Sequence, residues 1–167
     1  MDLKHGVIMH SRIFQVSAEK EFERASEVDY FEDFLGSIAD SVEVVEDKDA
    51  VLYDIERLER FLNGAVMFND DYSMMTIVNK RLYFEKCYGE FKASLDKLYS
   101  KATEDTFCDG GLDTDMYSVN SSYDDKFGYY IDISGDCSGF PITVSEFMRE
   151  VKDGDTFYMG TVTDYHF

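Results

Sequence analysis

Tryptophan is absent from this sequence of 167 residues, proline occurs once, and cysteine and histidine occur three times each. Cys87, Cys108 and Cys137 show neither the even number of a disulfide framework nor the CxxC spacing of a zinc site, so we expect reduced thiols in a cytosol. Glycine-rich phosphate loops and HExxH motifs are missing, which excludes several common enzyme classes. No apolar run reaches the roughly 18 residues of a membrane span or resembles the core of a signal peptide, and we expect a cytoplasmic protein.

Basic residues are scarce relative to acids. Lys and Arg number 16 against 35 Asp and Glu, which gives a formal net charge of −19. Affinity for a phosphate backbone comes from Lys and Arg, so this balance argues against direct nucleic-acid binding and favours a basic partner. Hydrophobic residues make up 44% of the chain and aromatic residues 16%, so it has the apolar material for a folded core despite its charge.

The periodicity of the apolar residues predicts an α+β fold in a single compact domain over residues 1–167, with central helices and a small antiparallel sheet. Alternation predicts strands over residues 6–16, 127–134 and 156–167, and a short strand at 42–45. In the last of these strands, alternation places four apolar side chains on one face: Phe157, Met159, Tyr165 and Phe167.

Two helical stretches are predicted in the first part of the chain. Ser17 is expected to cap a helix over residues 18–28, and a helical pattern continues over residues 28–63 apart from the short strand. Asp47 or Asp49 caps the second half of that pattern, which stops at Asn63-Gly64 because these residues readily adopt the left-handed conformation.

Two further helices have clearer signals. A long helix is predicted from apolar residues at alternating steps of four and three, namely Phe84, Tyr88, Phe91, Leu95 and Leu98. A short helix begins at the capping box of Thr143 and Glu146 and completes a C-terminal strand–helix–strand unit. By composition, residues 17–101 form a helical sub-region and residues 102–167 a β-rich one.

The most acidic stretch runs from Glu104 to Asp136 and holds nine acids against one base, Lys126. Its glycines, serines and Asn120 favour turns over long helices, so we expect a loop-rich surface displayed on a firm scaffold. Acid and tyrosine interleaved on one surface suit a basic groove. The candidate partner-binding residues are therefore Asp109, Asp113, Asp115, Tyr117, Tyr123, Asp124 and Asp125, together with Asp29, Glu32 and Asp33.

One short segment around Cys137 resembles a catalytic motif. The run from Gly135 to Pro141, with Cys137 after Gly-Asp, resembles the nucleophile loop of chymotrypsin-like proteases, in the form used by viral cysteine variants. That chemistry needs a general base upstream within two β-barrels, whereas the only upstream histidines, His5 and His10, lie at the N-terminus. Neighbouring acids also raise the pKa of a thiol, so we interpret the segment as a structural turn and expect no catalytic residue.

Metal sites are weighed in the same way. The window of residues 113–124 ends on an acid, as an EF-hand loop does, but has Ser118 where that loop needs glycine and Tyr117 at a ligand position. Zinc bound by Cys108, Cys137 and a histidine has no support from spacing. We expect no specific metal or cofactor, and only weak association of divalent cations with the acidic stretch.

These observations predict a non-enzymatic inhibitor that binds a basic nucleic-acid-handling protein, such as a nuclease or its nucleic-acid channel. Duplex DNA carries about one charge per 1.7 Å of axis, so a folded surface of carboxylates is able to occupy the same channel. In composition alone, the chain is similar to small acidic proteins that phages use against restriction or CRISPR nucleases. The alternatives are a bacterial immunity protein or antitoxin that neutralises a basic toxin, a small cysteine-dependent enzyme, and an acidic domain whose charge only confers solubility. A monomer and a homodimer are both compatible with the sequence.

Overall fold

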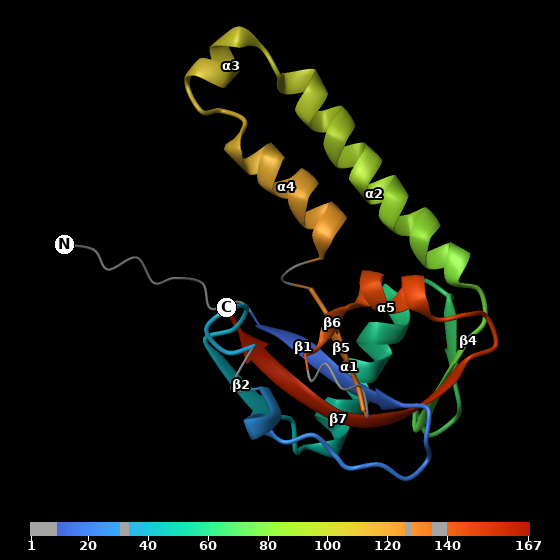
Figure 1. The fold of residues 1–167 in the computed structure, drawn as a ribbon. Coiled ribbons are helices and arrows are strands. Elements are labelled where there is room, and N and C mark those ends of the chain that lie inside the picture. The colour runs from blue at the N-terminus through green and yellow to red at the C-terminus, as the bar shows by residue number, and fades with distance from the viewer. Residues whose placement is uncertain (1–9, 31–33, 126–127, 135–139) are drawn as a thin grey trace.

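The computed structural model describes residues 10–30, 34–125, 128–134 and 140–167. Figure 1 shows a body built around a β-sheet and, above it, helices that project away from the body as a long arm. The helical segments are η1 (Glu27–Tyr30), α1 (Lys48–Phe61), α2 (Lys80–Lys101), α3 (Glu104–Cys108), α4 (Asp113–Asp124) and α5 (Val144–Glu150). The arm consists of α2, α3 and α4, and the other helical segments belong to the body (Figure 1).

Over the described residues, seven strands form one sheet in the order β3-β4-β7-β1-β5-β6, with β2 also paired to β7. The strands are β1 (His10–Ser17), β2 (Ser41–Val44), β3 (Val66–Phe68), β4 (Met74–Ile77), β5 (Tyr130–Ile133), β6 (Ile142–Thr143) and β7 (Thr156–His166). β7 is central, because one of its edges pairs with β1 and the other with β4 and then β2. The predicted α+β class is confirmed, although β1 and β5 run parallel in an otherwise antiparallel sheet.

The two faces of the sheet carry separate apolar clusters. On one face α1 and α5 cover β1 and β7, and Phe14, Leu58 and Phe147 are almost completely buried there. The smaller cluster on the other face is formed by Ile13, Tyr30, Phe34, Ala39, Tyr130 and Tyr165. Removing such side chains from water contributes roughly 25 cal/mol per Å² of apolar surface, so these clusters hold the body together.

A β-bulge in β7 changes which side chains face which cluster. Phe14 pairs with Val162 and Val16 pairs with Met159, so β7 has one residue more than β1 across this interval. The alternation of side chains therefore reverses at residues 160–161. The prediction of one shared face along the last strand is wrong: Phe157 and Met159 face α1 and α5, whereas Tyr165 and Phe167 join the opposite cluster.

Gln15 lies opposite this bulge and fixes it. Its side-chain oxygen accepts hydrogen bonds from the backbone N–H of Thr161 at 3.1 Å and of Ala25 at 2.9 Å. A Cβ atom on Gly160 would lie 2.4 Å from that oxygen, so only glycine fits at this position. The same side chain donates from Nε2 to the carbonyl of Glu23, which ties the segment after β1 to the sheet.

These contacts explain why the helix predicted over residues 18–28 is wrong. Residues 18–26 have no regular structure, and only the short η1 follows. Their backbone groups bond to Gln15, and the Arg24 guanidinium donates to the carbonyl of Met159 at 2.7 Å. Tertiary hydrogen bonds override the local helical pattern here. Residues 34–40, also in the predicted helical pattern, form turns against the second apolar cluster.

Several other sequence predictions for the body are confirmed. The Asp47 side chain caps α1 by accepting from the N–H of Ala50 at 2.8 Å, and Asn63 and Gly64 end that helix with φ of 55° and 76°. The capping box of Thr143 and Glu146 begins α5. Strands β2, β5 and β7 lie where strands are predicted, and β1 begins at His10, since residues 1–9 lie outside the described part. Helices and strands occur on both sides of residue 101, and the strands share one sheet.

Candidate protein-binding site

The arm contains most of the acidic stretch, and the expectation of a loop-rich stretch is wrong. Thr103 and Thr106 form a capping box that begins α3, and the Gly110 backbone adopts a φ of 73° in the turn that follows. α4 then begins with Asp113 and Asp115 in its first turn, where negative charge is favourable for the helix dipole. Twelve residues rich in Asp, Ser and Asn are therefore helical, because they pack against α2.

α2 and α4 pack as an antiparallel pair. Lys101 at the end of α2 contacts Asp115 at the start of α4, and the Phe91 ring lies 5.6 Å from the Tyr123 ring further along both helices. The residues along the seam are half-buried or buried: Cys87, Phe91, Ser94 and Leu98 on α2, Leu112 just before α4, and Asp115, Ser118, Val119 and Ser122 on α4. The seam is narrow, and much of each helix surface stays exposed.

Asp115 belongs to this seam and does not face solvent. It is 2% exposed, and its carboxylate lies 3.0 Å from the Nζ of Lys97 and 2.7 Å from the Nζ of Lys101. Hydrogen bonds from Lys101 and Lys97 hold the pKa of this carboxyl below its usual value. Asp115 therefore links α4 to α2, which corrects its assignment as a partner-binding residue.

Asp125 is also used inside the molecule. It follows α4 in the left-handed conformation, with a φ of 53°, and its carboxylate accepts from the hydroxyl of Tyr83 at 3.0 Å and from the hydroxyl of Ser145. Lys86 on α2 donates to the carbonyl of Phe61 at the end of α1, at 3.0 Å. These bonds join the base of the arm to α1 and α5 and hold the arm in a fixed direction.

One side of the arm carries exposed apolar side chains, which we call the aromatic face. On α2 these are Tyr88, Leu95 and Tyr99, with exposed fractions of 66%, 40% and 85%. Each of these residues directly follows a seam residue, and so do Met116 and Tyr123 on α4, with exposed fractions of 46% and 67%. On antiparallel helices a shift of one residue from the seam leads to the same side of the pair. The five side chains therefore share one face of the arm.

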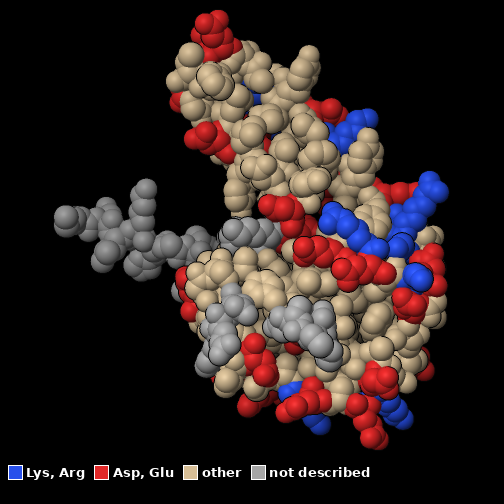
Figure 2. All heavy atoms as spheres, viewed as in Figure 1, with Lys and Arg blue, Asp and Glu red and all other residues tan. Residues whose placement is uncertain are grey.

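The outer end of the arm is acidic. Its exposed acids, which we call the acidic tip, are Glu104, Asp105, Asp109 and Asp113. Phe107 lies among them and is 79% exposed. Figure 2 shows acids at the top of the arm and a surface largely without charge below them. The arm thus combines an uncharged face with a strongly negative end.

The candidate residues from the sequence are distributed as follows. Asp109, Asp113, Tyr117, Tyr123 and Asp124 are exposed on the arm, whereas Asp115 and Asp125 are bound internally. Asp29 lies on the body, where its carboxylate accepts from the N–H of Ser26 at 2.6 Å, and Glu32 and Asp33 lie outside the described residues. Sequence reasoning missed the aromatic face, because it used Tyr88 and Leu95 only as markers of the helical period of α2 and did not predict which of them are exposed.

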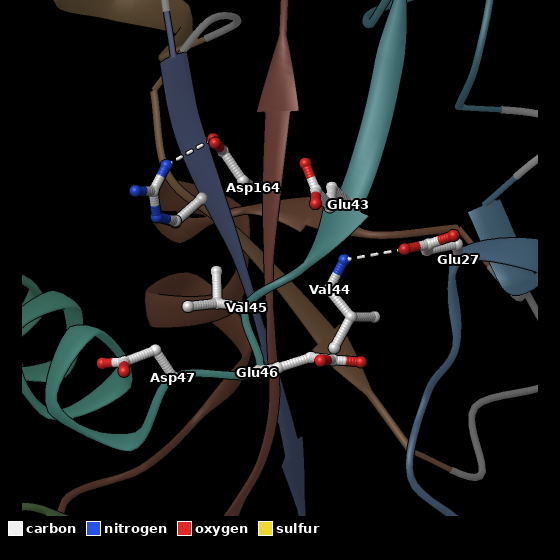
Figure 3. Close-up of a pocket in the computed structure, with 8 residues that line it drawn as sticks. Glu27, Glu43, Val44, Val45, Glu46, Asp47 and Asp164 are labelled. Carbon is white, nitrogen blue, oxygen red and sulfur yellow. Dashed lines mark hydrogen bonds and ion pairs between the residues drawn. The ribbon is translucent and has the colours of Figure 1, made fainter.

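A second concave feature lies on the body. A pocket of about 440 Å³ is lined by Arg12, Val44 and Val45 and by five acids, Glu27, Glu43, Glu46, Asp47 and Asp164 (Figure 3). Glu27 accepts a hydrogen bond from the N–H of Val44 at 3.2 Å, and Asp47 caps α1. None of the described residues that line it is a cysteine, serine or histidine. The five carboxylates of this lining suit a cationic group.

The structure bears on the cysteines and on the calcium-loop window of residues 113–124 in different ways. The segment around Cys137 lies outside the described residues, so its assignment as a turn stays a prediction. Burial raises the pKa of the half-buried Cys87 thiol, which disfavours a reactive thiolate. Residues 113–124 form α4 and cannot wrap around an ion as an EF-hand loop does.

Comparisons with protein-family models, with curated proteins and with solved structures found no match. Within the part of the chain that the structure describes, no helix combines the length and the apolar character needed to cross a bilayer.

Proposed function

We propose that this protein is a non-enzymatic inhibitor that acts in the cytoplasm and places its arm against a basic surface of a nucleic-acid-handling protein, such as a nuclease. The observation that carries this proposal is the aromatic face next to the acidic tip on one projecting element. In its acidic composition the protein is similar to phage proteins directed against restriction or CRISPR nucleases.

The aromatic face supports binding to a protein. Monomeric proteins rarely expose large contiguous apolar patches, and those that they do expose are often interaction sites. Tyrosine is enriched among the residues that dominate binding energy, because it buries a large rigid surface and keeps a hydroxyl for hydrogen bonding. Tyr88, Tyr99 and Tyr123 all belong to this face and are more than half exposed.

The acidic tip supports a basic partner. Its carboxylates add to a chain charge of −19, which attracts a positively charged surface and accelerates encounter at low ionic strength. The same charge repels a second copy of this chain. A groove that binds nucleic acid offers the complementary pattern, with Lys and Arg along its walls and apolar or aromatic groups that stack on bases.

A bacterial immunity protein or antitoxin that neutralises a basic nuclease toxin is the second candidate, and the same arm supports it. The two candidates differ in the target and not in the binding surface. Isolation of the target with the native chain, followed by its identification, separates them: a restriction or CRISPR nuclease supports the first candidate, and a nuclease toxin supports the second.

The test is capture of the target by the immobilised protein and by two variants. We expect the native chain to retain a basic nucleic-acid-binding protein and to inhibit it, and the combined variant Tyr88→Ser with Tyr99→Ser to lose both properties. Tyr53→Ser is the matched control, because Tyr53 is also an exposed tyrosine on a helix, with an exposed fraction of 57%, but lies on α1 of the body and not on the arm. Retention and inhibition that survive the double substitution contradict the proposal.

A further inference from the structure

A cluster of two histidines and one aspartate lies where β1 and β7 meet at one end of the sheet. Asp164 and His166 are two residues apart on β7, so their side chains point to the same face. In the antiparallel register His10 lies directly opposite His166, and Arg12 lies opposite Asp164. We propose that His10, Asp164 and His166 form a binding site for a transition-metal ion, with Zn²⁺ as the best-suited occupant.

The distances fit such an ion. Nδ1 of His10 lies 3.1 Å from Oδ2 of Asp164, and Nε2 of His166 lies 3.5 Å from the same oxygen. The three candidate ligand atoms all lie within 4.8 Å of one another. Zinc bonds of about 2.0 to 2.2 Å in a tetrahedral site separate the ligand atoms by roughly 3.4 Å. Small side-chain rotations therefore bring all three atoms to bonding distance.

Other side chains hold Asp164 in the orientation that the site requires. Nη1 of Arg12 donates to Oδ1 of Asp164, which leaves Oδ2 directed at the histidines. Nε of Arg12 donates at 2.5 Å to Asp54, a carboxylate on α1 that is 2% exposed. Hydrogen bonds of this kind, one shell beyond the ligands, fix the geometry of metal sites.

The charge around the cluster favours a cation. The Arg12 guanidinium contacts two carboxylates, Asp54 and Asp164, and Arg57 lies 3.9 Å from Asp54 alone. Glu43 on β2 is the cross-strand neighbour of Asp164, and both side chains line the acidic pocket, as Figure 3 shows. Three protein ligands leave a fourth position for a water molecule, as in open zinc sites.

The ligand set selects the class of metal. Imidazole nitrogens with one carboxylate suit Zn²⁺ and its neighbours in the transition series, whereas Ca²⁺ and Mg²⁺ prefer oxygen ligands alone. The side chains of His10, Asp164 and His166 are 50%, 18% and 27% exposed, so the site is accessible from solvent. A bound ion would cross-link the start of β1 to the end of β7 and stabilise the sheet.

The experiment is calorimetric titration of the full chain with ZnCl₂ and, separately, with MgCl₂, together with thermal unfolding in each salt. We expect one Zn²⁺ per chain, a higher melting temperature with zinc, and no comparable effect of magnesium. His10→Gln and His166→Gln should each weaken zinc binding by at least about tenfold, while circular dichroism shows an unchanged fold. Cobalt-loaded protein should show the visible bands of a nitrogen and oxygen site without thiolate absorption.

Two control variants address the other sources of metal affinity. Glu46→Gln removes a carboxylate from the same pocket but not from the cluster, and Cys108→Ala removes an exposed thiol; both should bind zinc as the native chain does. The proposal is overturned if the native chain binds no zinc, if magnesium has the same effect, if either histidine variant binds zinc normally, or if Cys108→Ala abolishes binding.

Discussion

Lys101 at the end of α2 donates a hydrogen bond of 2.7 Å from its Nζ to the carboxylate of Asp115 in the first turn of α4. Lys97 lies one turn earlier on α2 and contacts the other oxygen of the same carboxylate at 3.0 Å. An acid from the most acidic part of the chain thus holds two helices together. The charge of this stretch serves the fold of the arm as well as any partner.

Asp115→Asn should loosen the arm and leave the body intact, because it removes the charge that two lysines share. The pKa of Asp115 is lowered in the folded protein, so its stabilising effect is present above the unfolded value of 3.8 and is lost as the pH falls below it. We expect hydrogen exchange in α4 to accelerate below about pH 4 in the native chain. In the variant, exchange in α4 should be fast already at neutral pH.

Asp113→Asn is the control for this prediction, since Asp113 lies in the same first turn of α4 but is exposed. Its exchange profile should follow that of the native chain. Equal protection of α4 in native protein and Asp115→Asn would show that apolar packing alone holds the arm.

Alkaline pH should unfold the body through its buried tyrosines. Burial is the main cause that raises the pKa of Tyr30, Tyr83 and Tyr165 above the ordinary tyrosine value of 10.0, and it raises the pKa of Tyr130 to about 12. A raised pKa of an acidic hydroxyl means that the stability is present below about pH 10 and is lost as the pH rises above it. We expect a cooperative loss of near-ultraviolet circular dichroism above pH 10, together with tyrosinate absorbance.

Tyr30→Phe gives this effect a residue-level test. The Tyr30 hydroxyl donates to Oδ2 of Asp132 at 2.9 Å, so removing it should cost about 1 to 3 kcal/mol at neutral pH, because a partly buried carboxylate loses a partner. The variant should also lose less stability between pH 9 and 11 than the native chain. An unchanged alkaline midpoint in Tyr30→Phe would assign the transition to the other tyrosines.

Gly160→Ala should destabilise the protein by about 1 to 3 kcal/mol, because the new methyl group would lie 2.4 Å from Oε1 and 2.9 Å from Cβ of Gln15. Gly89→Ala is the matched control. Gly89 lies inside α2 and has no atom within 4 Å of the added Cβ, so alanine there should stabilise by roughly 0.5 to 1 kcal/mol. Urea unfolding of both variants measures the difference, and equal midpoints would contradict the role of the bulge.

The sequence predicts those elements whose signals are local. The caps of Asp47 and Thr143 and the periodicity of α2 and β7 depend on neighbouring residues, and the structure confirms the helices and strands that they mark. The helix predicted over residues 18–28 does not form. The Gln15 side chain on β1 bonds to the backbone of this segment, and its Arg24 side chain donates to the carbonyl of Met159 on β7. Such long-range bonds leave no trace in local periodicity.

In the candidate site, too, local features could be predicted from the sequence and long-range contacts could not. Composition correctly indicates an acidic, tyrosine-containing stretch, but its helical form depends on packing against α2 and on the Asp115 ion pairs. The apolar period of α2 predicts a helix but does not say which part of its stripe is buried. Packing of α2 against α4 buries only one side of each helix, and Tyr88 and Leu95 lie outside the buried side of α2. Likewise, the pairing of His10 with His166 exists only through the register of β1 and β7.

Binding of a basic target should separate into an apolar part and an electrostatic part, carried by the two regions of the arm. Tyr88→Ser with Tyr99→Ser should weaken binding by at least about tenfold through faster dissociation, since truncation of well-packed interface tyrosines costs 1 kcal/mol or more. Asp109→Asn with Asp113→Asn should instead slow association and flatten its dependence on salt, because rim charges act mainly on encounter. Neither change should alter stability by more than roughly 0.5 kcal/mol per residue, since all four side chains are exposed.

Stopped-flow measurements at low and high salt distinguish the two effects. The contrary outcome is a tyrosine variant that binds as the native chain does, together with an aspartate variant that loses affinity at every salt concentration. In that case the partner binds only the carboxylates, and the protein acts by mimicry of nucleic acid without an apolar contribution.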